Sequence, residues 1–61
     1  MSEVVYVAQV AAMLGMTEAA LRAHVYRESR AIPKHFKMGT RLAWRRATVL
    51  KWLEERERRG S

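Results

Sequence analysis

Hydrophobic residues near the start of the chain recur with the spacing of one helix face. They lie at positions i, i+3, i+4 and i+7 and are Val7, Val10, Ala11 and Leu14. The residue that follows, Gly15, suits the left-handed conformation that commonly ends a helix. We therefore predict a helix up to Leu14, entered from the β-prone segment 4–6 as an extended lead-in.

A second helix is predicted to begin abruptly after Thr17. Threonine is a good N-cap residue, and Glu18 in the first turn complements the positive end of the helix dipole. Leu21 and Val25 are four residues apart and should face the first helix. The outward side of this helix then carries Glu18, Arg22 and Tyr26.

The connection between the two predicted helices is short. Only Gly15 and Met16 lie between the end of the first helix and the Thr17 cap. A helix, a tight turn containing glycine and a second helix form the helix-turn-helix layout. The second helix has to end before Pro33, because the residue preceding a proline is pushed towards extended backbone.

The pattern changes from helical to alternating after Pro33. Apolar and polar residues alternate along 35–38 and again along 41–44, on either side of Gly39-Thr40. Two short alternating runs around a Gly-X pair predict a β-hairpin, and the glycine-first order favours a type II′ turn. From 46 to 59 the spacing is helical again, with an apolar stripe of Val49, Trp52 and Leu53.

Large apolar side chains are scarce in this chain, which helps to decide whether they lie in the core or on the surface. Phe36, Trp44 and Trp52 are candidates either for the core or for platforms on which single-stranded bases stack. We expect them in the core, because the chain has few other large residues to fill one. The four methionines are expected to fill gaps in that core.

Composition limits the architecture to one small domain. The chain has 61 residues, no cysteine and a hydrophobic content of 49%, so packing rather than disulfides must stabilise it. We predict a single domain, residues 1–61, that is mainly α with a small β-hairpin. The expected fold is a winged helix-turn-helix with about three helices and a two-stranded wing.

Charge narrows the class of partner. The net charge is +6, and the segment from Arg22 to Lys51 holds nine basic residues and one acid. Such a concentrated positive field attracts a polyanion, either nucleic acid or an anionic membrane surface. The membrane surface is less favoured, because the basic residues fall on a hairpin and on separate helices rather than on one amphipathic helix.

Several other classes are not supported by the sequence. No apolar run approaches the about 18 to 20 residues that span a bilayer, and the first residues show no export signal, so we expect a cytoplasmic protein, nucleoid-associated when bound to DNA. No catalytic constellation is recognisable, so we expect no enzymatic activity. His24 and His35 do not have a metal-site spacing, and we expect neither a metal nor a cofactor.

The order of motifs resembles a known family. Leu14-Gly15-Met16-Thr17, then Pro33-Lys34, then Lys37-Met38-Gly39-Thr40-Arg41, and finally Trp44-Arg45, Val49 and Trp52-Leu53 follow one another along residues 5–55. This set is similar to the AlpA and excisionase-type members of the MerR-like winged helix-turn-helix superfamily. The resemblance implies a small prophage or mobile-element protein. Such proteins regulate transcription, or act as directionality factors that bend DNA beside an integrase.

The chain departs from the family pattern in three places. Tyr6 stands where the family usually has a serine or threonine cap. The span from Thr17 to Pro33 is a few residues longer than usual. Glu18 and two alanines occupy positions of the second helix where hydroxyl and basic residues are common, which puts the DNA sequence that is recognised in doubt rather than the fold.

Candidate DNA contacts fall on the second helix and on the wing. In the major groove, Arg22 would donate to guanine and Glu18 would accept from cytosine, unless both are ordinary solvated residues. The wing would straddle a phosphate strand or enter the minor groove, unless it is a small hairpin with ordinary exposed charges. The candidate DNA-binding residues are Thr17, Glu18, Arg22, Tyr26, Arg27, Lys34, Lys37, Thr40, Arg41 and Arg45.

These patterns predict a protein that binds double-stranded DNA in a sequence-specific manner. It would act as a transcription regulator or as an excisionase-type directionality factor, and the sequence does not choose between them. An integrase, or further copies of the chain as a dimer or a head-to-tail array on DNA, are the other expected partners. The alternative is a protein-interaction module whose basic face binds an acidic partner or an integrase.

Overall fold

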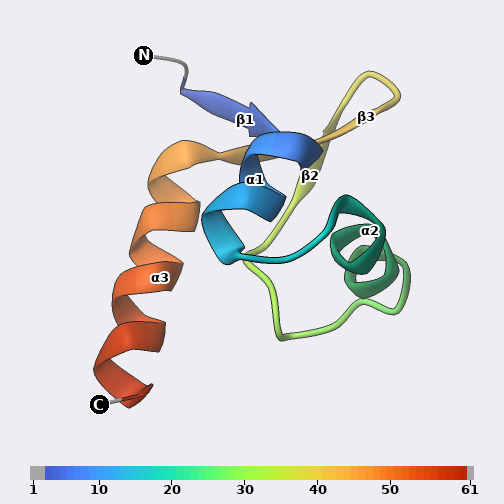
Figure 1. Ribbon diagram of the computed structural model, residues 1–61. Helices are drawn as coiled ribbons and strands as arrows, with labels where there is room; N and C mark the ends of the chain where they lie inside the picture. The colour runs from blue at the N-terminus through green and yellow to red at the C-terminus, as the bar shows by residue number, and fades with distance from the viewer. Residues whose placement is uncertain (1–2, 61) are drawn as a thin grey trace.

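The computed structural model describes residues 3–60 and contains three helices and a three-stranded sheet (Figure 1). In chain order the elements are β1 (Val4–Tyr6), α1 (Val7–Leu14), α2 (Glu18–Tyr26), β2 (Phe36–Met38), β3 (Arg41–Arg45) and α3 (Arg46–Gly60). The predicted helix-turn-helix and hairpin are confirmed. The predicted two-stranded wing is extended by a strand, because the lead-in before α1 pairs with β3.

The turn between α1 and α2 forms as its sequence predicts. Gly15 has a φ of 71°, a left-handed conformation that a side chain would strain, and Met16 N–H donates to the Ala11 carbonyl at 3.0 Å. The Thr17 hydroxyl oxygen accepts from the Ala20 N–H at 3.1 Å and so caps α2. These bonds hold α2 in place against α1.

The sheet has the order β1-β3-β2, and both pairs of strands are antiparallel. Gly39 has a φ of 67°, whereas Thr40 is not among the described residues with positive φ, which is the pattern of φ signs in a type II′ turn. At the other end of β3, Arg46 N–H donates to the Glu3 carbonyl at 2.8 Å. The wing is therefore the distal end of a sheet whose middle strand leads directly into α3.

The core lies between one face of this sheet and the helices. Trp44, Val10, Leu21 and Val49 are fully buried there. The Trp44 indole N–H also donates to the Pro33 carbonyl at 3.1 Å, so one side chain both fills the core and fastens the loop between α2 and β2.

Two expected core residues lie on the opposite face of the sheet, so that expectation is wrong for them. Phe36 is 39% exposed and Met38 is 45% exposed. Phe36 pairs with Ala43, and Met38 pairs with Arg41, whereas Leu42 and Trp44 alternate with these partners and face the core. A two-residue turn therefore cannot direct both Phe36 and Trp44 inward.

The last helix packs only through its first half. Val49 is buried, Trp52 and Leu53 are half-buried, and residues 54–60 are exposed. Figure 1 shows α3 on the other side of α1 from α2, running away from the sheet. Within residues 3–60, no helix combines the length and the apolar character that crossing a membrane requires.

Candidate nucleic-acid interface

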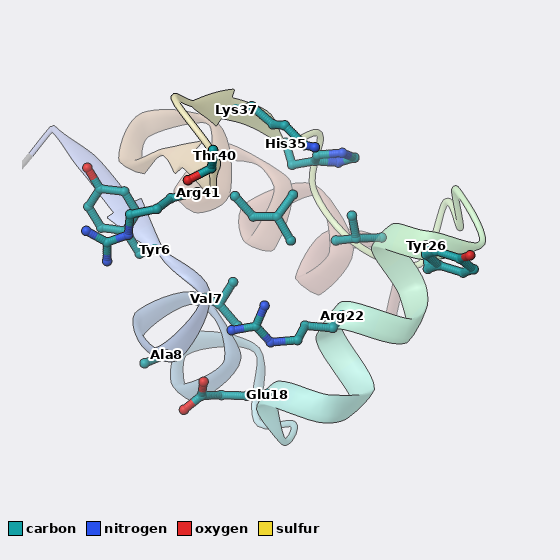
Figure 2. Close-up of a pocket in the computed structure, with 12 residues that line it drawn as sticks. Tyr6, Val7, Ala8, Glu18, Arg22, Tyr26, His35, Lys37, Thr40 and Arg41 are labelled. Atoms are coloured by element: carbon teal, nitrogen blue, oxygen red, sulfur yellow. The ribbon is translucent and has the colours of Figure 1, made fainter.

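A cleft of about 750 Å³ separates α2 from the wing (Figure 2). Its lining comes from the start of α1, from α2, and from the hairpin with the residues just before it. The lining residues are Tyr6, Val7, Ala8, Glu18, Arg22, Val25, Tyr26, His35, Lys37, Thr40, Arg41 and Leu42. Six of the ten candidate DNA-binding residues are among them.

One wall of the cleft is the outward face of α2. Glu18, Arg22 and Tyr26 are spaced by four residues, so they form one row along the helix, and all three are exposed. Tyr26 is 91% exposed, a large aromatic surface left to solvent. Leu21, next to Arg22 in sequence, is fully buried against the core, so its packing fixes the direction in which the row points.

The opposite wall is the wing. Lys37 lies on β2, Thr40 in the turn and Arg41 at the start of β3. The Arg41 guanidinium carbon lies 4.0 Å from the centre of the Tyr6 ring, which is the distance of a cation–π contact. Figure 2 shows Arg41 lying along this ring, while Lys37 and His35 lie at the upper edge of the cleft.

Arg22 and Arg41 both border this cleft, Arg22 from α2 and Arg41 from the sheet face that also carries Met38. Both line the cleft, although they come from different elements and are 19 positions apart in sequence. Together with Lys37 they place three cations around one open space, with Glu18 as an acid at its edge. The arrangement provides hydrogen-bond donors on two walls, facing a space that is open to solvent.

The other four candidates lie outside this cleft. Thr17 is occupied as the cap of α2, and the Arg27 side chain donates from Nε to the Ala23 carbonyl at 3.4 Å. Lys34 lines a neighbouring hollow. Arg45 is at the far end of β3, where its guanidinium lies 3.4 Å from the Glu3 carboxylate and both side chains are largely exposed.

The sequence-based list missed six residues that line the cleft: Tyr6, Val7, Ala8, Val25, His35 and Leu42. Tyr6 matters most among them because it contacts Arg41. Its role follows from the pairing of β1 with β3, and a three-residue strand gives too short a pattern to predict that pairing.

The neighbouring hollow, of about 340 Å³, lies below the loop between α2 and β2. It is lined in part by Arg30, Lys34 and the two histidines, and it shares Val25 and His35 with the main cleft. The Nδ1 atom of His24 is buried there without a hydrogen-bond partner. In the described part of the chain, no three acidic or histidine side chains come close enough together to hold a metal ion.

Comparison of the chain with models of known protein families, with curated proteins and with solved structures finds no match. The function is therefore inferred from the cleft itself and from the resemblance of the sequence motifs.

Proposed function

We propose that this protein binds double-stranded DNA in a sequence-specific manner, with α2 in the major groove and the wing on the adjacent backbone. The observation that carries the proposal is the shared cleft. An exposed row of polar side chains on a helix and a cationic hairpin tip face the same space. This combination suits a protein that contacts a groove and its flanking phosphates at once.

The α2 row suits contacts with base edges. A major groove about 12 Å wide admits one α-helix, and residues on its first turns reach the bases. Arg22 would donate two hydrogen bonds to guanine, and Glu18 would accept one from cytosine. Tyr26, one turn further along, would contact the sugar-phosphate backbone.

The wing suits contacts that do not depend on sequence. Lys37 and Arg41 lie on the two strands that flank the turn, so together they span the wing. Positive side chains in this position bind phosphates, or enter a narrow minor groove where the potential is most negative. Lys34 and Arg45 lie outside the cleft and would extend this contact only to more distant phosphates.

The biological setting that we propose follows from the sequence resemblance. A prophage or mobile-element regulator and an excisionase-type directionality factor use the same DNA-binding unit. The residues of the cleft would bind DNA in the same way in a regulator and in a directionality factor, so we propose both roles. An integrase, or further copies of the chain bound side by side on DNA, would be the protein partners.

A salt titration of binding to a duplex tests the proposal. Each neutralised phosphate contributes a slope of about −0.9 to the plot of log K against log salt, so three contacts predict about −2.7 or steeper. Arg41→Ala should make this slope shallower by about 0.9, whereas Arg58→Ala should leave it unchanged. Arg58 is a matched control because it is an exposed arginine on α3, outside the cleft.

A shallow slope with no retention on DNA would refute the proposal. It would favour the alternative, in which the same basic face binds an acidic protein surface. Selection of bound sequences from a random duplex library then tests specificity. A library that remains random after selection would contradict base recognition by α2.

A further inference from the structure

The strand β1 brings Tyr6 beside the wing. Tyr6 pairs with Ala43, and Arg41 lies two residues before Ala43 on the same strand, so Tyr6 and Arg41 are diagonal neighbours on one face of the sheet. This register brings the two side chains together, and the Arg41 guanidinium carbon lies 4.0 Å from the centre of the Tyr6 ring.

Stacking on a ring restricts an arginine without using its hydrogen-bond donors. The five N–H groups of a guanidinium lie in its plane, whereas the aromatic contact is made through its face. A free arginine side chain loses considerable rotamer entropy when it is immobilised on a ligand. Arg41 is exposed, so it would lose that entropy on binding unless another group already restrained it.

The structure shows no other strong role for Tyr6. It occupies the N-cap position of α1, but its side chain makes no capping hydrogen bond, and its backbone N–H donates to the Gln9 side chain at 3.3 Å instead. It is only half-buried, and it belongs neither to the buried core cluster nor to the partly buried residues packed against it. The contact that distinguishes Tyr6 is therefore the one with Arg41.

We propose that Tyr6 is a positioning residue that holds Arg41 in the orientation needed to bind a DNA phosphate. This inference rests on the proposed function. It also accounts for the tyrosine at a helix-cap position, where serine or threonine would cap α1 but provide no aromatic surface.

The test is a double-mutant cycle with a mixed-sequence duplex as the probe, because a phosphate contact does not depend on the base sequence. Tyr6→Ile keeps a good strand former and removes the ring, and Tyr6→Phe keeps the ring. We expect Tyr6→Ile to weaken binding about two- to fivefold, and Tyr6→Phe to bind like the wild type. In an Arg41→Ala background, Tyr6→Ile should cause no further loss.

Proton NMR of the free wild-type protein gives a second measurement. It needs no DNA, and it does not depend on whether the Tyr6→Ile variant folds. Ring currents of Tyr6 should move the side-chain protons of Arg41 upfield of their random-coil positions. This displacement should persist in Tyr6→Phe and vanish in a folded Tyr6→Ile variant. Absence of the displacement in the wild type would overturn the inference.

The binding outcomes separate the two proposals. If the wild type does not bind the duplex, the proposed function fails and this inference fails with it. If the wild type binds, Arg41→Ala weakens binding and Tyr6→Ile does not, only the inference is overturned. An equal loss from Tyr6→Ile with and without Arg41 would show a structural role for Tyr6 and would also overturn it.

Discussion

Arg22 and Arg41 share one cleft but have different surroundings. Arg22 extends from a helix whose other side is anchored by the buried Leu21, so its reach is set by where α2 sits. Arg41 lies beside a tight turn and is held by a ring. The first geometry suits the floor of a groove, and the second suits the phosphates at its edge.

Alanine substitutions should therefore have different consequences at the two arginines. We expect Arg22→Ala to cost about 1 to 3 kcal/mol of binding free energy on the selected site and to relax preference at one base pair. Arg41→Ala should weaken binding to all sequences alike. Parallel selections from a random duplex library measure both effects. Losses that are equal and independent of sequence for both variants would show that α2 is not the recognition helix.

Trp44 connects the core to the loop that precedes the wing. Trp44→Phe keeps an aromatic side chain but removes the donor to the Pro33 carbonyl, a buried interaction. An unsatisfied buried acceptor costs about 1 to 3 kcal/mol, and the smaller ring also leaves a cavity in the core, so the free energy of unfolding should fall by at least that amount. Urea denaturation followed by circular dichroism measures it. An unchanged midpoint would mean that the hydrogen bond contributes nothing to stability.

Among the elements, the start of α2 combines a structural role with a proposed binding role. The Thr17 hydroxyl caps the helix, and the N–H groups of its first turn are the end that attracts anions. Aspartate caps a helix as threonine does, but its negative charge would repel a nearby phosphate, which the threonine hydroxyl does not. The two roles can therefore be separated by one substitution.

We expect Thr17→Asp to leave the free energy of unfolding within about 0.5 kcal/mol of the wild type, because the cap is retained. Affinity for duplex DNA should fall by about fivefold or more, because a carboxylate then faces phosphates. Thermal denaturation and fluorescence anisotropy measure the two quantities. A variant that binds as tightly as the wild type would place the start of α2 away from the DNA.

The elements also show what the sequence could and could not predict. The end of α1 and the cap of α2 follow from local signals, namely Gly15 and Thr17, and both are confirmed. The start of α1 had no such signal, because no capping residue precedes Val7. The position of Phe36 was predictable in principle, because a two-residue turn places 36 and 38 on the face that carries 41 and 43. Treating each strand separately led to the wrong expectation for Phe36.

The pairing of β1 could not be predicted in this way. Its three residues form too short a pattern, and its partner strand begins 35 positions after Tyr6. The cleft was anticipated only through its polar residues, since the row of Glu18, Arg22 and Tyr26 follows from helical spacing. Its remaining lining depends on how the sheet and α1 meet, which is a tertiary property.

At the scale of the whole molecule, the proposed binding of DNA and the stability of the folded state are linked. The chain buries a small core without disulfides, and its cleft is formed by elements that pack around that core. Bound DNA would span α2 and the wing and so would favour the folded state. Ligand binding to the folded state alone raises stability by mass action.

We expect the melting temperature to rise by about 10 to 20 °C when duplex DNA is present at one hundred times its Kd, which corresponds to about 2.7 kcal/mol. Differential scanning fluorimetry with and without duplex measures the shift. Binding without such a shift would contradict a site that exists only in the folded protein. It would show instead that the unfolded basic chain binds DNA equally well.

The pairing of β1 with β3 has a consequence for synthesis of the protein on the ribosome. Synthesis produces β1 before the strand at 41–45 with which it pairs in the described part of the chain, and that partner strand also carries Trp44. The cleft does not exist until β3 is in place, because β3 supplies part of its lining and holds Tyr6 beside Arg41. The cleft, and the DNA binding that we propose for it, therefore depends on β3 being available to pair with β1.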